Sequence, residues 1–194
     1  MDNHLQPYFD FLEKEVIPLE PLLLDHQYDE LYMSLDKLRQ QVKKQGLWAP
    51  YLPVEHGGQG MTLIEFAAVS EILGRSPLGH YTFNCQAPDI GNIELLSHFG
   101  SDKQKQTFLK PLMDGAIRSC IGMVEPDRPG SNPTWIDTAA VQDGNAYVIN
   151  GRKWFTSSAD GASFCIVMAV TNPAAENRHQ QASMIIVPMD TPGV

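Results

Sequence analysis

The fold is decided by the stretch Thr138-Ala139-Ala140-Val141-Gln142-Asp143-Gly144-Asn145-Ala146-Tyr147-Val148-Ile149. Its two apolar runs flank Asp143-Gly144-Asn145, and Asp-Gly tolerates the positive φ that a hairpin turn requires. The stretch therefore predicts a β-hairpin. Short apolar runs at 119–124, 164–170 and 184–187 predict further strands, the last two buried on both faces or nearly so. The polar residues 171–182 between them predict an exposed loop.

The chain before Gly115 has the periodicity of helices. Leu31, Leu35, Leu38 and Val42 form one helical stripe, which Gly46 can end. Thr62-Leu63-Ile64-Glu65 is a capping box. Further helices are expected around residues 90–96 and after a Ser101 N-cap. Helices followed by strands predict an α+β fold, with an all-α domain at 1–117 and a β-barrel or sandwich domain at 118–194.

Composition limits the possible partners. The chain of 194 residues carries 23 acidic and 14 basic residues, a net charge of −9, without a dense basic cluster. Nucleic acid and anionic membranes are therefore poor candidates. The start of the chain has no signal or transit peptide, and the longest apolar run, 164–170, is far short of the ~20 residues that span a bilayer. We expect a soluble, cytoplasmic protein without a membrane segment.

Cysteine and histidine usage argues against a metal centre. Cys85, Cys120 and Cys165 are far apart and odd in number, which fits neither a disulfide framework nor a zinc site. We expect buried, reduced thiols. None of the six histidines has a carboxylate or cysteine at metal-ligand spacing, so no metal is predicted.

Glycines at 57, 58 and 60 form the first of three stretches that could carry chemistry. They could cradle a phosphate, but no strand precedes them and no Lys-Ser/Thr pair follows. A tight helix-to-helix turn is the favoured interpretation.

The other two stretches lie in the β part. In Met123–Asn132 a strand runs into a stiff loop that holds backbone N–H groups and the Ser131 hydroxyl; a binding site and an ordinary surface loop are both open. In Asn150–Asp160 the adjacent Trp154 and Phe155 stand beside three hydroxyls. They could flank a flat heteroaromatic ring, or lie at a strand-to-strand bend with the aromatics in the core.

These three stretches occur together, in this order, in the acyl-CoA dehydrogenase family, which the chain resembles along essentially its whole length. The similarity is greatest to the branch related to the human family members ten and eleven. It rests on the motifs Gly46-Leu47-Trp48, Leu52-Pro53-Val54-Glu55-His56-Gly57-Gly58, Glu71-Ile72-Leu73-Gly74-Arg75-Ser76-Pro77, Phe83 to Asn92, Phe99 to Lys105, Glu125-Pro126-Asp127 and Tyr147 to Trp154.

The resemblance implies a helical domain, a β-domain and a C-terminal four-helix bundle, of which the bundle is absent from this chain. It also implies FAD as cofactor. The cofactor-binding positions that it assigns are Ile121, Met123, Val124, Gly130, Ser131, Phe155, Thr156 and Ser157. Ser131 would also approach the acyl-CoA substrate, and Ser157 would donate toward the flavin N5 region.

Two positions depart from the family pattern. Val124 stands where the family usually has Thr, and Phe155 stands where it usually has Trp. Each change removes a hydrogen bond worth about 0.5–1.5 kcal/mol, and neither alone forbids FAD. The bundle would form one wall of the flavin site, so FAD is expected to be bound weakly by this chain or to be absent.

The resemblance also bears on activity and partners. In the family a glutamate abstracts the α-proton of the thioester, and hydride passes from the β-carbon to the flavin. Because the segment that supplies this base is not in the chain, we assign no catalytic residue and expect the chain alone to be inactive. The implied partners are acyl-CoA, electron-transfer flavoprotein and further copies of the chain. A flavin-dependent monooxygenase of the same fold and a non-catalytic flavin-binding or assembly subunit are the alternatives.

Overall fold

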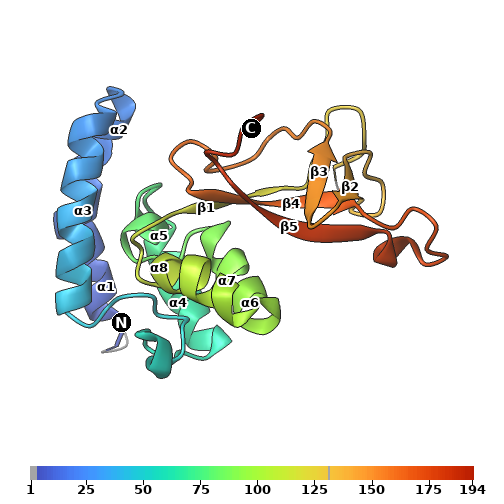
Figure 1. The fold of residues 1–194 in the computed structure, drawn as a ribbon. Helices are drawn as coiled ribbons and strands as arrows, with labels where there is room; N and C mark the ends of the chain where they lie inside the picture. The colour runs from blue at the N-terminus through green and yellow to red at the C-terminus, as the bar shows by residue number, and fades with distance from the viewer. Residues whose placement is uncertain (1–3, 131) are drawn as a thin grey trace. The chain divides into compact units, whose positions relative to one another are not determined.

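A computed structural model describes residues 4–130 and 132–194, which form two compact units (Figure 1). One unit contains the chain up to Ile90 together with Met113–Gly115, and the other contains Gly91–Leu112 and Ala116–Val194. The domain boundary between residues 117 and 118 stays a prediction. Together the units hold the expected helical part and β part.

The first half of the chain is helical. No helix within residues 4–130 or 132–194 is long and apolar enough to cross a membrane. The helices are α1 (Gln6–Phe11), η1 (Leu12–Val16), η2 (Ile17–Leu19), α2 (Glu20–Leu24), α3 (Tyr28–Lys44), η3 (Val54–His56), α4 (Leu63–Leu73), α5 (Gly79–Thr82), α6 (Asp89–Phe99), α7 (Asp102–Gln104), η4 (Lys105–Leu109), α8 (Lys110–Met113) and, among the strands, η5 (Arg178–Gln180).

The predicted stripe and cap are confirmed in α3 and α4. The stripe Leu31, Leu35, Leu38 and Val42 is buried, and the chain leaves α3 through Gly46 at φ +70°. At α4 the Thr62 N–H donates to Glu65 Oε2 over 2.8 Å, and the Glu65 N–H donates to Thr62 Oγ1 over 3.3 Å. Two otherwise unpaired N–H groups are thus satisfied at the start of the helix. A second capping box starts α7, where Ser101 is the predicted N-cap.

The glycine-rich stretch before α4 is a tight turn, as favoured from the sequence. The N–H groups of Gly58 and Gly60 donate within the turn, to Pro53 O over 3.2 Å and Leu52 O over 2.7 Å. A Cβ at Gly58 would lie 2.2 Å from Leu52 O, so the close backbone packing requires glycine. Both donors are therefore used inside the turn, which explains the glycines without a phosphate.

The strands form one five-stranded mixed sheet. Strand β4 (Phe164–Val170) is central: it pairs in parallel with β1 (Ser119–Gly122), in parallel with β2 (Ala139–Asp143) at Val170, and antiparallel with β5 (Ala182–Pro188). The predicted hairpin is confirmed, since β2 pairs antiparallel with β3 (Ala146–Asn150) and Gly144 has φ +59°. Phe164, Ile166 and Ala169 are fully buried, as predicted for the central strand.

Helical segments cover part of the sheet within the second unit. The Asn92 side chain of α6 donates to Ser119 Oγ over 2.9 Å and to Cys120 O over 3.2 Å. The rings of Phe108 and Phe164 lie 4.9 Å apart. These contacts hold α6 and η4 against β1 and β4.

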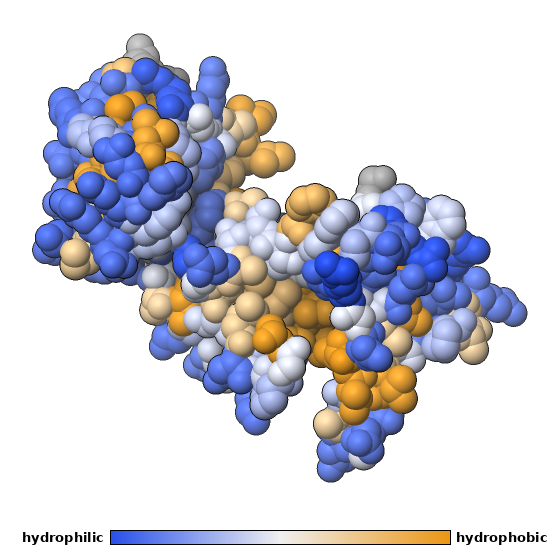
Figure 2. All heavy atoms as spheres, turned by 90° about the horizontal axis from the view of Figure 1, so that it is seen from above, coloured by the Kyte–Doolittle hydropathy of each residue, from blue (hydrophilic) through white to orange (hydrophobic). Residues whose placement is uncertain are grey.

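One burial prediction is wrong. Strand β5 is half exposed along its length, with Met184 49% exposed, because apart from its partner β4 little of the described chain packs against it. Apolar side chains accordingly gather on the surface of the strand-containing unit, at the right of Figure 2. The exposed large apolar residues of its strands are Val141, Tyr147, Val148 and Met184.

Candidate functional site

The loop that follows β1 begins with three of the predicted cofactor-binding residues. Ile121 lies in β1, paired with Ile166 of β4, and Met123 and Val124 follow at the strand end. Gly130 returns to this point: a Cβ there would lie 2.7 Å from Val124 Cγ1. The loop is therefore closed by packing of the Val124 side chain on a glycine. Ser131, predicted to contact both FAD and substrate, lies outside the described residues.

A backbone hydrogen bond joins this loop to the segment after β3. The Trp154 N–H donates to Val124 O over 3.1 Å. The next residue, Phe155, has φ +49° and its side chain is 78% exposed. A bulky residue with positive φ is strained, and such strain concentrates at functional sites. The Trp154 and Phe155 rings lie 4.5 Å apart. Two aromatic surfaces are thus presented beside the predicted flavin loop, outside the hydrophobic core.

The hydroxyls after Phe155 are available to a ligand. Neither Thr156 nor Ser157 uses its hydroxyl in a hydrogen bond with another described residue. Thr156 is half-buried and Ser157 is exposed. Of the eight predicted positions, seven are described, and the structure links Val124 directly to Gly130 and, through Trp154, to the Phe155–Ser157 segment.

A buried ion pair lies behind these two segments. Lys153 Nζ lies 2.8 Å from Glu125 Oε1, with the side chains 12% and 5% exposed. The backbone N–H groups of Asp137 and Thr138 donate to the same carboxylate over 2.7 and 2.8 Å. Burial raises the pKa of Glu125, but Lys153, Thr138 and the Asp137 N–H outweigh it and bring the pKa to about 2. Glu125 is therefore ionised, and its oxygens are engaged.

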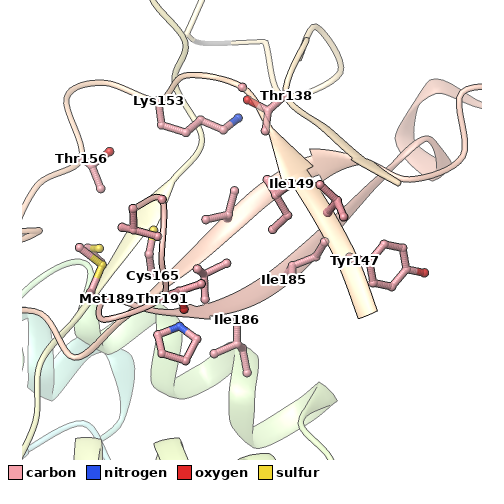
Figure 3. A pocket seen from close by; sticks show the side chains of 18 of the residues that line it. Thr138, Tyr147, Ile149, Lys153, Thr156, Cys165, Ile185, Ile186, Met189 and Thr191 are labelled. Carbon is pink, nitrogen blue, oxygen red and sulfur yellow. The ribbon is translucent and has the colours of Figure 1, made fainter. Parts of the chain in front are cut away.

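A hollow of the second unit is adjacent to the predicted site and does not coincide with it (Figure 3). Its volume is ≈ 1160 Å³, and of the seven predicted residues that the structure describes only Thr156 lines it. Its wall is largely the apolar face of β3, β4 and β5, including Ile149, Cys165 and Ile186. Figure 3 shows the Lys153 side chain extending toward Thr138 at its edge. We attribute the chemistry to the loops, because they carry the strained, polar and charged groups.

Two thiols line this hollow. Cys120 and Cys165 are partners in the β1–β4 register, and both are buried, as is Cys85. The Cys120 thiol, helped by the Gly122 N–H and Lys153, lowers the pKa of Cys165 against the opposing effect of burial. The predicted burial of the thiols is confirmed, and their reduced state stays a prediction. The described part of the chain contains no cluster of three His, Cys, Asp or Glu side chains that could hold a metal.

The Glu125–Lys153 pair is the part of the site that sequence reasoning missed. Both residues lie inside the quoted motifs, but they are 28 positions apart. A separation of this size carries no periodic signal, so only the folded chain shows that they are partners.

Comparison with known proteins identifies the class to which this fold and site belong. The N-terminal domain model of acyl-CoA dehydrogenases matches residues 6–116, and the middle domain model matches residues 120–194. Acyl-CoA dehydrogenase family member 10 of Mus musculus is 40% identical over 195 residues, covering 95% of this chain and 18% of the mouse protein. The structure of a putative acyl-CoA dehydrogenase from Mycobacterium abscessus is 37% identical with a TM-score of 0.88, covering 97% of this chain and 50% of the other. A glutaryl-CoA dehydrogenase from Mycobacterium smegmatis in complex with FADH2, at 22% identity and TM-score 0.70, shares the fold, over 100% of this chain and 47% of its own.

The chain belongs to the acyl-CoA dehydrogenase family. It has the helical N-terminal domain and the mixed-sheet middle domain of that fold. The chain spans about a fifth of the curated relative and half of the Mycobacterium abscessus chain.

The described residues fit the flavin that the family implies. An exposed aromatic surface is held in place by a backbone hydrogen bond, two hydroxyls beside it are unengaged among the described residues, and Val124 of the loop opposite packs on Gly130. Flat heteroaromatic ligands are bound by this combination of aromatic faces and a few placed polar groups. The Val124 side chain offers no hydroxyl, so a polar contact at that position falls to its backbone.

Proposed function

We propose that this chain forms the flavin-binding part of an FAD-dependent acyl-CoA dehydrogenase of the fatty-acid oxidation type. The observation that carries the proposal is the hydrogen bond from Trp154 to Val124 O. It supports the proposal because the strained, exposed Phe155 follows Trp154 directly, and the resemblance assigns flavin contacts to the loop that contains Val124. When bound, FAD supplies the acceptor for the hydride that leaves the β-carbon of the acyl thioester.

The chain's own residues have distinct roles in this proposal. Phe155 packs against the flavin ring, and the hydroxyls of Thr156 and Ser157 donate to its polar edge. Donation toward the N5 region favours the reduced ring electrostatically. The Val124 backbone N–H, in place of the hydroxyl of the more usual threonine, is the donor from the loop after β1.

Proton abstraction from the substrate is a separate requirement. Glu125 is the carboxylate between the two flavin segments, but Lys153 and two backbone N–H groups engage it and hold its pKa at about 2. A general base works best with a pKa near the operating pH, so Glu125 is unsuited to this step. We therefore propose that the 194 residues alone do not turn over acyl-CoA. We also propose that the protein acts in the cytoplasm, with electron-transfer flavoprotein and further copies of the chain as its partners.

The test is a visible absorbance spectrum of the purified chain after incubation with FAD and desalting, combined with its intact mass. A flavin spectrum that survives desalting is the expected result. A colourless protein of the correct mass would overturn flavin binding by this chain and favour the alternative, a non-catalytic assembly subunit. The packing of Val124 on Gly130 supports that alternative, since it occupies the position with an apolar side chain. Turnover of any acyl-CoA by the chain alone would overturn the proposed lack of activity.

A further inference from the structure

The ion pair between Glu125 and Lys153 differs from the other ion pairs of the described residues. The pairs Lys14–Asp10, Arg75–Glu13 and Arg128–Asp137 have side chains that are at least 35% exposed. Exposed pairs contribute little to stability, whereas breaking a buried pair leaves an uncompensated charge. Loss of either Glu125 or Lys153 should therefore disturb the segments that pack around the pair.

Three separate segments meet at this pair. Glu125 follows β1, the N–H groups of Asp137 and Thr138 precede β2, and Lys153 follows β3. Lys153 Nζ also donates to Met123 O over 3.0 Å. One charge pair with three further hydrogen bonds thus ties together both flavin segments and the entry to β2.

The hydrogen bond from Lys153 to Met123 O sets the direction of the neighbouring Val124 N–H. Met123 C=O and Val124 N–H belong to one peptide group, and the cis bond of the described chain is at Ala87-Pro88 instead. In a trans peptide the C=O and N–H point in opposite directions. Because Lys153 holds the carbonyl, the Val124 N–H must point away from Lys153.

The position after Lys153 is held by the same arrangement. The Trp154 N–H donates to Val124 O over 3.1 Å, so the carbonyls of both Met123 and Val124 are engaged by adjacent residues of the other segment. The strained Phe155 comes next. A strained residue persists only where its surroundings over-determine it, and Lys153 and Trp154 provide that constraint.

We infer that Glu125 and Lys153 are positioning residues of the flavin site, which act by orienting the Val124 N–H and the Phe155–Ser157 segment. The inference rests on the proposed function for its ligand. Neither side chain has to touch the flavin, since both act through the backbone of the two segments.

The test uses single, double and conservative variants of the full chain. Glu125→Gln and Lys153→Met each remove one charge, and the double variant leaves no unpaired charge behind, so it is the version expected to fold if a single variant does not. Lys153→Arg keeps the charge. Arg128→Gln is the matched control, since Arg128 forms a bidentate but exposed ion pair with Asp137 in the same loop.

Two readouts are measured on folded protein: the dissociation constant for FAD together with the visible spectrum of the saturated complex, and the backbone amide NMR signals of Val124 and Phe155 without FAD. We expect each single variant to weaken FAD binding by about tenfold or more and to shift both the spectrum and the amide signals. The double variant is expected to be no worse than the worse single one, because the two residues act as a unit. Lys153→Arg is expected to recover most of the affinity, and Arg128→Gln to stay within about twofold of the parent chain.

The outcomes distinguish a failure of the positioning role from a failure of the proposed FAD binding. If the parent chain binds FAD and the variants match it in affinity and spectrum, the inference is overturned and the proposed function stands. If the parent chain binds no FAD, the proposed function is overturned. In that case unchanged Val124 and Phe155 amide signals in the variants would also overturn the positioning role, and shifted ones would support it.

Discussion

The backbone N–H of Trp154 donates to the carbonyl oxygen of Val124 over 3.1 Å. This bond joins two stretches that the sequence marks separately, the loop after β1 and the segment after β3. It also explains why Phe155 is exposed and strained, since the chain must leave Trp154 in a direction set by the bond.

Changing Val124→Thr should strengthen FAD binding. The two side chains have nearly the same shape, and threonine adds the hydroxyl that the family usually carries here. A gained hydrogen bond is worth about 0.5–1.5 kcal/mol, so the dissociation constant should fall by up to about tenfold. Fluorescence titration of FAD measures it. Val124→Ala is the control that should show no gain, and an unchanged affinity for Val124→Thr would contradict a flavin contact at this position.

Changing Phe155→Gly should separate stability from binding. Glycine relieves the cost of positive φ, about 1–2 kcal/mol, but loses the ring contact with Trp154 and adds backbone entropy to the unfolded chain. The free energy of unfolding should therefore stay within about 1 kcal/mol, while FAD affinity falls by about tenfold or more. Urea unfolding and FAD titration give the two values. Phe155→Trp should retain or improve binding, and equal binding by the glycine variant would show that this ring does not face the flavin.

The acid limb of the stability curve, meaning the fall in the free energy of unfolding as the pH is lowered, should depend on Glu125. Its pKa in the folded chain is about 2, below the ordinary value of 4.5. Its contribution is thus fully present above pH 5 and is lost as the pH falls toward 2, because the unfolded carboxyl takes up its proton first. This contribution is on the order of 3 kcal/mol.

Unfolding midpoints measured between pH 7 and pH 2.5 test this dependence. Glu125→Gln should flatten the acid limb, whereas Glu71→Gln, which removes an exposed carboxylate of α4, should leave the curve of the parent chain. An acid limb that is equally steep in the Glu125→Gln variant would exclude the ion pair as its origin.

Changing Gly130→Ala should destabilise the loop after β1. The new Cβ would lie 2.7 Å from Val124 Cγ1, and overpacking of this kind costs about 1–3 kcal/mol. Adding Val124→Ala removes the γ carbons and should recover part of that loss, so the two changes should not be additive. Denaturant unfolding followed by circular dichroism measures the cycle. Strict additivity would mean that Gly130 and Val124 are not in contact.

Local features of the fold followed from the sequence because their causes are local. The capping box at Thr62 and Glu65 depends on residues three apart, and the hairpin depends on Asp143-Gly144 between two apolar runs. The stripe of α3 needs only helical spacing. The prediction that β5 is buried was wrong because an apolar run does not reveal whether other elements cover the faces of a strand.

The sequence by itself determined the family, the order of helices and strands, and the two stretches that hold the candidate flavin site. Only the tertiary structure decided which atoms connect those stretches. Glu125 and Lys153 are 28 positions apart. Trp154 and Val124, the donor and acceptor of the backbone bond, are 30 positions apart. Contacts between residues so distant depend on the pairing of β1 with β4 and of β2 with β3, which no local pattern specifies. The strain at Phe155 has the same origin, since its positive φ is imposed by the contacts of its neighbours against the preference of its own side chain.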